Sequence, residues 1–160
     1  MQRFLFIAAA LVLHISAFSQ TSDLPLEKKS KEELIQFIKE NIETYGNFMN
    51  GSVNYRMVYK PEEPNHISIA ENMSGDFTWY KIDLAKADFG STVKIQAGGK
   101  DNFFISFLKD ISIKENKNKN ARPDVAFHRK KDRRETDYEQ LHQDLSIAFT
   151  LLIEKCKAHP

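Results

Sequence analysis

The chain has 160 residues, of which 41% are hydrophobic, 11% aromatic and 28% charged. This length predicts one domain, and the aromatic content excludes an intrinsically disordered chain. A single cysteine excludes an intrachain disulfide scaffold, and 23 basic against 22 acidic residues leave no basic excess of the kind that nucleic-acid-binding domains carry.

An apolar leader opens the chain. Arg3 supplies a positive charge, residues 4–17 are apolar with two exceptions, and Ala17-Phe18-Ser19 places small residues where signal peptidase cleaves. We expect residues 1–19 to be a signal peptide that is cleaved near Ser19-Gln20. Residues 20–160 are then a single α+β domain in the periplasm or outside the cell. A retained membrane anchor is the alternative, but no basic stop-transfer flank follows the leader.

A helix is predicted directly after a short polar lead-in at residues 20–29. Ser30 and Glu33 form the Ser-x-x-Glu pattern of a capping box, in which each side chain accepts from the other residue's backbone N–H. Apolar residues then recur at helical spacing, at Leu34, Ile35, Ile38, Ile42 and Tyr45. We therefore expect an amphipathic helix over residues 30–45, ended by Gly46 in a left-handed conformation.

From residue 51 to 128 the hydrophobic pattern changes to a period of two, which predicts six or seven short antiparallel strands in a meander. The expected strands lie at 53–59, 67–69, 77–84 with a bulge near Tyr80, 93–95, 103–108, 111–113 and 125–127. Gly98-Gly99 predicts a tight hairpin. The run at 103–108 is apolar on both faces, so it predicts a central strand covered on two sides. KENKNKNARP, at residues 114–123, is a polar loop of low complexity.

A second capping box, at Thr136 and Glu139, begins the last predicted helix. Its apolar positions are Tyr138, Leu141, Leu145, Ala148, Phe149, Leu152 and Cys156. Cys156 is expected to be a small buried hydrophobe; a disulfide to a second chain is the alternative. Ile147 and Leu151 widen the apolar arc beyond one face, so the 30–45 helix should cover them, or else a second copy of the protein in a homodimer.

No catalytic, cofactor or metal-binding motif is present. The four histidines after the leader are His66, His128, His142 and His159, and none has a spacing that would bring two imidazoles to one metal. His142 is expected at the rim of the last helix, and the turn carboxylates Glu62 and Glu63 in solvent. We expect no enzyme and no cofactor. An enzyme would require a deep pocket in which several of one set of side chains converge: His66, His128, His142, Asp83 and Asp88.

The charges are unevenly distributed. Residues 114–134 hold nine basic side chains against three acids, a balance of 9 − 3 = +6, whereas residues 61–90 hold two bases against six acids, a balance of 2 − 6 = −4. The basic set is Lys114, Lys117, Lys119, Arg122, Arg129, Lys130, Lys131, Arg133 and Arg134. It predicts binding to an anionic surface such as phospholipid head groups, a polyanionic saccharide or an acidic protein. The alternative is a solvated run of charge.

The order of elements over residues 51–157, a meander followed by an amphipathic helix ending LSIAFTLLIEKC, resembles the pleckstrin-homology-like (PH-like) fold. This resemblance implies a bent barrel plugged by the helix, and binding rather than catalysis. Two helices packed on one face of an open antiparallel sheet fit the same pattern. The leader is similar to those of small exported Bacteroidota proteins of unknown function. We expect a non-enzymatic exported binding or interaction module; the alternatives are an enzyme with an unrecognised site and a self-associating subunit.

Overall fold

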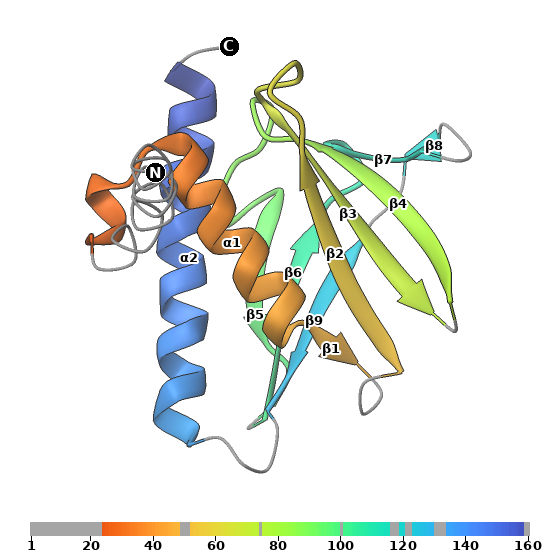
Figure 1. The fold of residues 1–160 in the computed structure, drawn as a ribbon, viewed down its shortest axis with the longest axis vertical. Helices are drawn as coiled ribbons and strands as arrows, with labels where there is room; N and C mark the ends of the chain where they lie inside the picture. The colour runs from red at the N-terminus through yellow and green to blue at the C-terminus, as the bar shows by residue number, and fades with distance from the viewer. Residues whose placement is uncertain are drawn as a thin grey trace, which may run out of the picture.

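The computed structural model describes residues 24–48, 52–73, 75–99, 101–115, 119–120, 123–129 and 134–158. The signal peptide expected at residues 1–19 lies outside these ranges. The described residues form two α-helices and two antiparallel sheets, which confirms the α+β class (Figure 1). None of the described helices is both long enough and apolar enough to cross a bilayer.

The first α-helix, α1 (Lys31–Tyr45), begins where the capping box predicts it. The Ser30 hydroxyl accepts from the Glu33 backbone N–H at 3.1 Å, and the Glu33 carboxylate accepts from the Ser30 N–H at 2.6 Å. The buried residues of α1 are Leu34, Ile35, Ile38 and Ile42, all of them positions with the predicted helical spacing. A short 3-10 helix, η1 (Leu26–Lys28), precedes α1 within the predicted lead-in.

The prediction for Gly46 is wrong. Its φ of −65° and ψ of 117° are extended, because the chain runs directly from α1 into strand β1 (Asn47–Phe48), which pairs with the strand that follows. Glycine is needed here for space instead of for a left-handed turn: a Cβ at this position would lie 2.4 Å from the Ile42 carbonyl oxygen.

The larger sheet of the described residues has the strand order β1-β2-β3-β4-β7-β8. Its longer strands are β2 (Val53–Tyr59), β3 (His66–Met73), β4 (Asp76–Asp83) and β7 (Ser112–Lys114), and a two-residue strand, β8 (Lys119–Asn120), lies at its edge. The sequence did not predict β8, because it falls within the low-complexity run at 114–123. The alternating lysines and asparagines of this run contain no apolar residue, so they give no hydrophobic pattern from which a strand could be predicted.

The bulge predicted near Tyr80 is absent from β4. The pairing of β3 with β4 runs without interruption from His66–Asp83 to Met73–Asp76. The shift in alternation has another cause: Phe77 and Trp79 lie on the face that carries the exposed residues of β2, whereas Tyr80 and Ile82 lie on the core face. Both faces of β4 therefore carry large side chains.

The smaller sheet consists of β5 (Val93–Ala97), β6 (Asn102–Phe107) and β9 (Asp124–His128), with β6 in the centre. Phe103, Ile105 and Phe107 are buried, and Phe107 packs edge-on against Phe149 of the last helix with 5.9 Å between ring centroids. Ser106, on the opposite face of the strand, is also buried. The prediction of a central strand covered on two sides is confirmed.

The predicted single meander is wrong. Strand β4 pairs with β7, not with β5, because β5 and β6 leave the larger sheet and form the smaller one with β9. The structure therefore shows two sheets that are not closed into one bent barrel. It also differs from the alternative in which both helices lie on one face of a single sheet.

The two sheets meet along β1, β2 and β9. Gly46 forms a bridge to Phe127, and the Asn47 side-chain amide donates to the His128 carbonyl at 3.3 Å. The buried Tyr55 hydroxyl accepts from the Ala126 backbone N–H at 3.1 Å, which joins β2 to the outer edge of β9. These polar contacts join the two sheets, which share one hydrophobic core.

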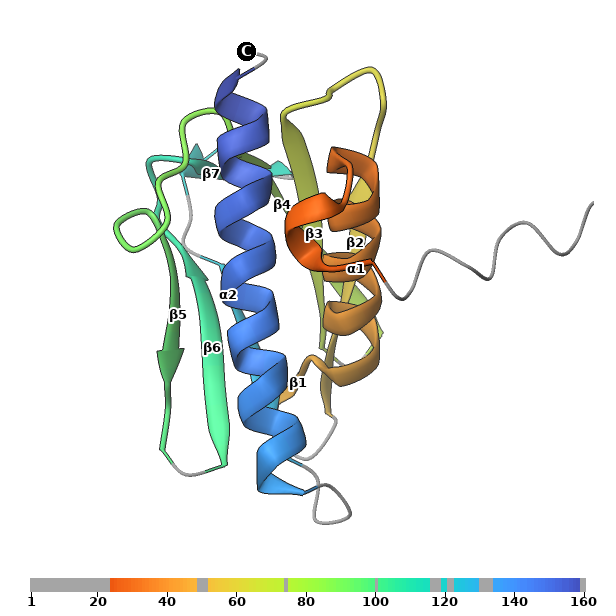
Figure 2. The same ribbon diagram turned by 90° about the vertical axis from the view of Figure 1, so that its left-hand side faces the viewer.

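The second α-helix, α2 (Glu135–Ala158), lies beside α1 in front of the sheets (Figure 2). Cys156 is a fully buried free thiol, as predicted. Helix α1 covers only part of the apolar arc of α2. Ile147 remains 40% exposed and Leu151 is partly buried, so the widened flank of α2 is not fully covered within the described chain.

Candidate functional site

An aromatic and cationic cluster lies on the solvent face of the larger sheet. We name Arg56, Phe77 and Trp79 the outer cluster. The Arg56 guanidinium carbon lies 4.9 Å from the centroid of the Phe77 ring, and the Phe77 and Trp79 ring centroids are 6.3 Å apart with 25° between their planes. Because Phe77 and Trp79 are two residues apart on β4, they share one face of the strand.

Ala70 makes the outer cluster possible. It pairs with Arg56 on one side and with Trp79 on the other, so it lies between them on β3. Its side chain is small enough for the arginine to cross β3 and reach the Phe77 ring on β4. Ala70 is completely buried although it faces away from the core, which shows that the larger side chains cover it.

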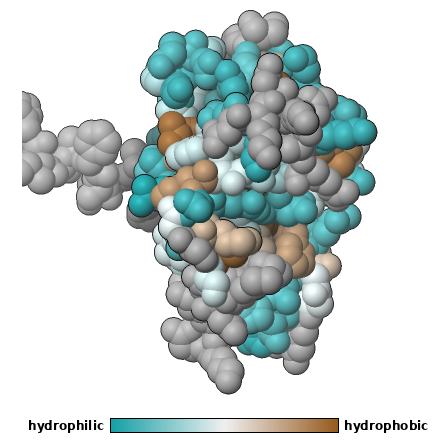
Figure 3. Space-filling view, turned by 90° about the vertical axis from the view of Figure 1, so that its right-hand side faces the viewer, coloured by the Kyte–Doolittle hydropathy of each residue, from teal (hydrophilic) through white to brown (hydrophobic). Residues whose placement is uncertain are grey.

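The outer cluster is flanked by exposed apolar side chains. Val58 is 37% exposed and Ile113 is 41% exposed, and both lie on the solvent face by strand register. Figure 3 shows the side of the molecule turned away from α2, where apolar residues form separate patches among hydrophilic ones. A sheet face with aromatic, aliphatic and guanidinium groups together is chemically equipped to bind another surface.

Arg56 differs from its charged neighbours on this sheet. Lys81 forms an ion pair with Glu63 at 2.5 Å, and Glu115 accepts from the Ser68 hydroxyl at 2.9 Å. Within the described part of the chain, the exposed Arg56 guanidinium has no hydrogen bond or ion pair, only the Phe77 ring beneath it. A guanidinium stacked on a ring keeps its in-plane N–H groups available to a carboxylate or phosphate.

A second polar group lies on the core side of the same sheet. The Tyr80 hydroxyl donates to the Glu71 carboxylate at 3.3 Å, and the Lys114 ammonium lies 5.9 Å from the Tyr80 ring centroid. Burial raises the pKa of Glu71, and burial together with the Glu71 charge raises the pKa of Tyr80 to about 12. Lys114 from the predicted basic set therefore contacts an aromatic ring near a carboxylate.

The described members of the basic set do not form one patch. Lys114 and the backbone of Lys119 lie at the β7–β8 edge, whereas Arg129 and Arg134 lie at the opposite end of the molecule, between β9 and α2 (Figure 1). Arg129 forms a hydrogen bond and an ion pair with Asp101, and Arg134 is exposed. The remaining members, Lys117, Arg122, Lys130, Lys131 and Arg133, lie outside the described residues.

Among the candidate acid–base residues, the structure brings only His66 and Asp83 together. The His66 Nε2 lies 3.9 Å from the Asp83 carboxylate, which also pairs with Lys86 at 2.8 Å. Burial acts to raise the pKa of Asp83, but the hydrogen bond and charge of Lys86 outweigh it, so the pKa is lowered.

The other candidates are separate from this pair. His128 bonds Asn102, Asp88 bonds Ser91 and Lys157, and His142 packs edge-on against Phe103. His159 lies outside the described residues. In the described ranges, no three His, Cys, Asp or Glu side chains form a group that could hold a metal ion.

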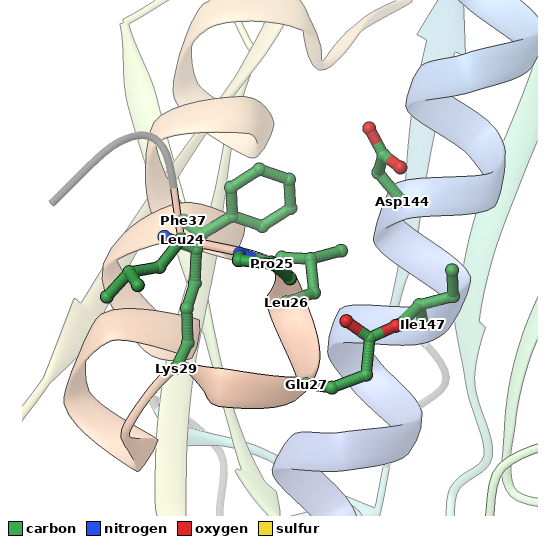
Figure 4. A pocket seen from close by; sticks show the side chains of 8 residues that line it. All are labelled: Leu24, Pro25, Leu26, Glu27, Lys29, Phe37, Asp144 and Ile147. Carbon is green, nitrogen blue, oxygen red and sulfur yellow. The ribbon is translucent and has the colours of Figure 1, made fainter.

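A cavity of about 340 Å³ lies between η1, α1 and α2 (Figure 4). Leu24, Pro25 and Leu26 form one side of it, Phe37 comes from α1, and Asp144 and Ile147 come from α2. A second hollow of about 250 Å³ continues along α2 past Ile147. None of the candidate histidines lines either one.

The sequence pattern predicts neither the outer cluster nor this cavity. The alternation predicts a strand for Phe77 and Trp79 but not their position on its solvent face, and residues 20–29 are predicted only as a polar lead-in. The Leu24-Pro25-Leu26 pattern is the signal that could have indicated a segment packed against the helices, because it concentrates apolar side chains beside a turn.

Comparison of the chain with protein-family models, with curated proteins and with solved structures finds no match in any of the three. The surfaces themselves are therefore the basis for a functional argument.

Proposed function

We propose that the protein is an exported, non-enzymatic binding module that holds an acidic protein partner through the outer cluster. The observation that carries this proposal is the exposed Arg56 guanidinium, stacked on Phe77 beside Trp79 and without a carboxylate partner among the described residues. Its charge matches an acidic surface, and the rings beside it offer apolar area.

The composition of the outer cluster supports a protein partner. Trp and Arg are enriched among the few interface residues that supply most of the binding free energy, and these residues sit in the middle of a surrounding ring of weaker contacts. Here Val58 and Ile113 provide apolar contacts in the neighbouring row of the sheet, and Lys81, paired with Glu63, lies between them.

Charge favours a protein over a membrane or a polyanionic saccharide. Both of those present dense negative charge, which is recognised by clusters of several basic side chains. The described solvent face of the larger sheet instead has one cation without an ion pair, Arg56; Lys81 is paired with Glu63, and the Glu115 carboxylate accepts from the Ser68 hydroxyl. One carboxylate on an otherwise apolar surface is the best match.

The test measures binding of the mature protein to three fluorescent probes: a short peptide of alternating Glu and Leu, phosphatidylglycerol vesicles, and heparin. We expect the peptide to bind, and Arg56→Gln to weaken its binding by about tenfold or more, since a hydrogen bond to a charged group contributes roughly 1.5–3 kcal/mol. Arg56→Lys should recover only part of the affinity, because lysine lacks the planar fork.

Lys109→Gln is the matched control, because it removes one exposed positive charge outside the outer cluster. It should leave peptide binding unchanged. Equal affinity of the wild type and Arg56→Gln for the peptide would contradict the assignment of the site. Binding of vesicles or heparin but not of the peptide would contradict the assignment of the partner.

We also propose that the domain is a variant of the PH-like architecture that residues 51–157 resemble. Two observations support this: α2 packs against the central strand of the smaller sheet, and the Gly46–Phe127 bridge joins the two sheets at an angle. The helix α1 is an addition to that plan. Export after cleavage near Ser19-Gln20 is supported by the charge and apolar pattern of the leader.

A further inference from the structure

The exposed flank of α2 forms a groove of its own, on a different face from the outer cluster. We name it the α2 groove: its apolar floor is Leu26, Phe37, Ile147 and Leu151, and its rim carries Glu27, Asp144 and Glu154. Ile147 lines both hollows, which therefore lie next to each other along this helix.

We propose that the α2 groove docks an amphipathic helix of a partner protein, with an apolar stripe flanked by Lys or Arg. This proposal is independent of the function proposed for the outer cluster. Its three supports are the spacing of the floor residues, the state of the small hydroxyl residues, and the sign of the charge along the rim.

The spacing of the groove residues suits a helical partner. Ser146 and Thr150 form one i,i+4 row on α2, and Ile147 and Leu151 form the next. Adjacent i,i+4 rows of small and large side chains make the ridge and groove into which the ridge of another helix fits. Amphipathic helices commonly dock in apolar grooves through this kind of spacing.

The two hydroxyl groups in the groove are already satisfied within α2. The Ser146 hydroxyl donates to the His142 carbonyl at 2.8 Å, and the Thr150 hydroxyl donates to the Ser146 carbonyl at 2.8 Å. A partner can therefore cover them with apolar atoms without leaving a donor unpaired. The row of small residues also lets a partner backbone approach closely.

The charge on the rim of the α2 groove indicates the sign of the charge that a partner should carry. Of the α2 residues that line the two hollows, Asp144 and Glu154 are charged, and both are acids. Glu27 adds a further carboxylate from η1 at the rim of the cavity. Lys29, which also lines the cavity, is buried and has an interaction of its own. Cationic flanks on the partner are the complement to this rim.

The same charges disfavour a second copy of the protein as the occupant. In an antiparallel pair of α2 helices with Ile147 opposite Leu151, position 144 faces position 154, because 147 + 151 equals 144 + 154. Asp144 of each protomer would then face Glu154 of its partner. Two such like-charge contacts per dimer are repulsive.

The experiment uses the full mature protein and two synthetic helical peptides with the same Leu stripe, one with Lys flanks and one with Glu flanks. Fluorescence anisotropy should show the Lys peptide binding at least about tenfold more tightly than the Glu peptide. Ile147→Ser should weaken binding of the Lys-flanked peptide by about tenfold or more, since it removes an apolar anchor from the floor of the α2 groove. The Asp144→Asn, Glu154→Gln double variant should lose the preference between the peptides.

Two controls separate this proposal from its competitors. Met73→Ser removes an apolar side chain that is 60% exposed outside the groove, and Arg56→Gln removes the outer cluster cation; both should leave Lys-peptide binding unchanged. Equal binding of the two peptides by the wild type, or full binding by a folded Ile147→Ser variant, would overturn the proposal. So would concentration-dependent dimerisation in sedimentation velocity that Ile147→Ser abolishes, because the occupant would then be a second copy.

Discussion

Ala70 shows how one small side chain can define a surface. A β-strand position on the solvent face of a sheet usually tolerates a large residue, but here the Arg56 side chain has to pass over it to reach Phe77. A larger side chain at this position would displace the guanidinium from the ring. The binding chemistry of the outer cluster thus depends on a residue that makes none of the polar contacts.

His142 carries a pH dependence of stability. Its Nε2 is buried and has no hydrogen-bond partner among the described residues, its ring packs edge-on against Phe103, and burial lowers its pKa. Between the lowered folded pKa and the unfolded value of about 6.5, the unfolded chain binds more protons than the folded one. The free energy of unfolding should therefore fall as the pH drops below about 6.5.

Urea unfolding at pH 7.5 and pH 5 measures this effect. His142→Gln keeps a polar side chain of similar reach but does not titrate, so its loss of stability between the two pH values should be smaller than that of the wild type. The same loss in both proteins would assign the effect to other groups, such as the carboxylates paired with Lys86 and Lys157.

At the scale of elements, the start of α1 rests on the capping box. Ser30→Ala removes the acceptor for the Glu33 N–H and should lower the free energy of unfolding by about 1 kcal/mol. Ser30→Asp, which retains an acceptor at the helix N-terminus, should stay close to the wild type. Chemical denaturation measures both, and a Ser30→Ala variant as stable as the wild type would contradict the energetic role of the cap.

Most elements could be predicted because their signals are local. The capping box fixed the start of α1, glycine-rich turns marked the hairpins, and the doubly apolar run at 103–108 marked β6 as a central strand. The predictions that were wrong concern features that depend on contacts between distant parts of the sequence. Nothing in the sequence between β4 and β7 indicates that β5 and β6 leave the sheet, and Gly46 is extended only because β2 and β9 are there to receive β1.

The candidate site was predictable in part. The charge count along the chain predicts the basic set. In the folded protein, however, the described members of this set lie at opposite ends of the molecule. Arg56, by contrast, has little local signal: its importance comes from a ring on β4 that is two strands away. Charge counts report sequence neighbours, whereas a binding surface is made of spatial neighbours.

At the scale of the whole molecule, Tyr55 connects the two sheets. Tyr55→Phe keeps the ring but leaves the Ala126 N–H without its acceptor in a buried position, and this should cost about 1–3 kcal/mol of folding free energy. Tyr59→Phe, at the partly buried end of β2, is the comparison for loss of a tyrosine hydroxyl. Thermal or urea unfolding compares the stabilities of the two variants. Equal stabilities would show that the hydrogen bond from Ala126 to Tyr55 contributes nothing to the free energy of unfolding.

The two proposed surfaces have opposite charge preferences. The outer cluster offers a guanidinium to an acidic partner, whereas the α2 groove offers carboxylates to a basic one. They lie on different layers of the molecule, one on the larger sheet and the other on the helices (Figure 2). Together, the two proposals predict that two proteins of opposite charge bind at the same time without competing with each other.

The contact between β1 and β9 also bears on the order in which the chain folds. Asn47 and His128, which bond across this contact, are separated by 81 residues, whereas β2, β3 and β4 pair through short hairpins. Local hairpins form in microseconds, while contacts of such long range must first close a large loop. We therefore expect the contact between β1 and β9 to form after the hairpins of the larger sheet, once β9 is in place.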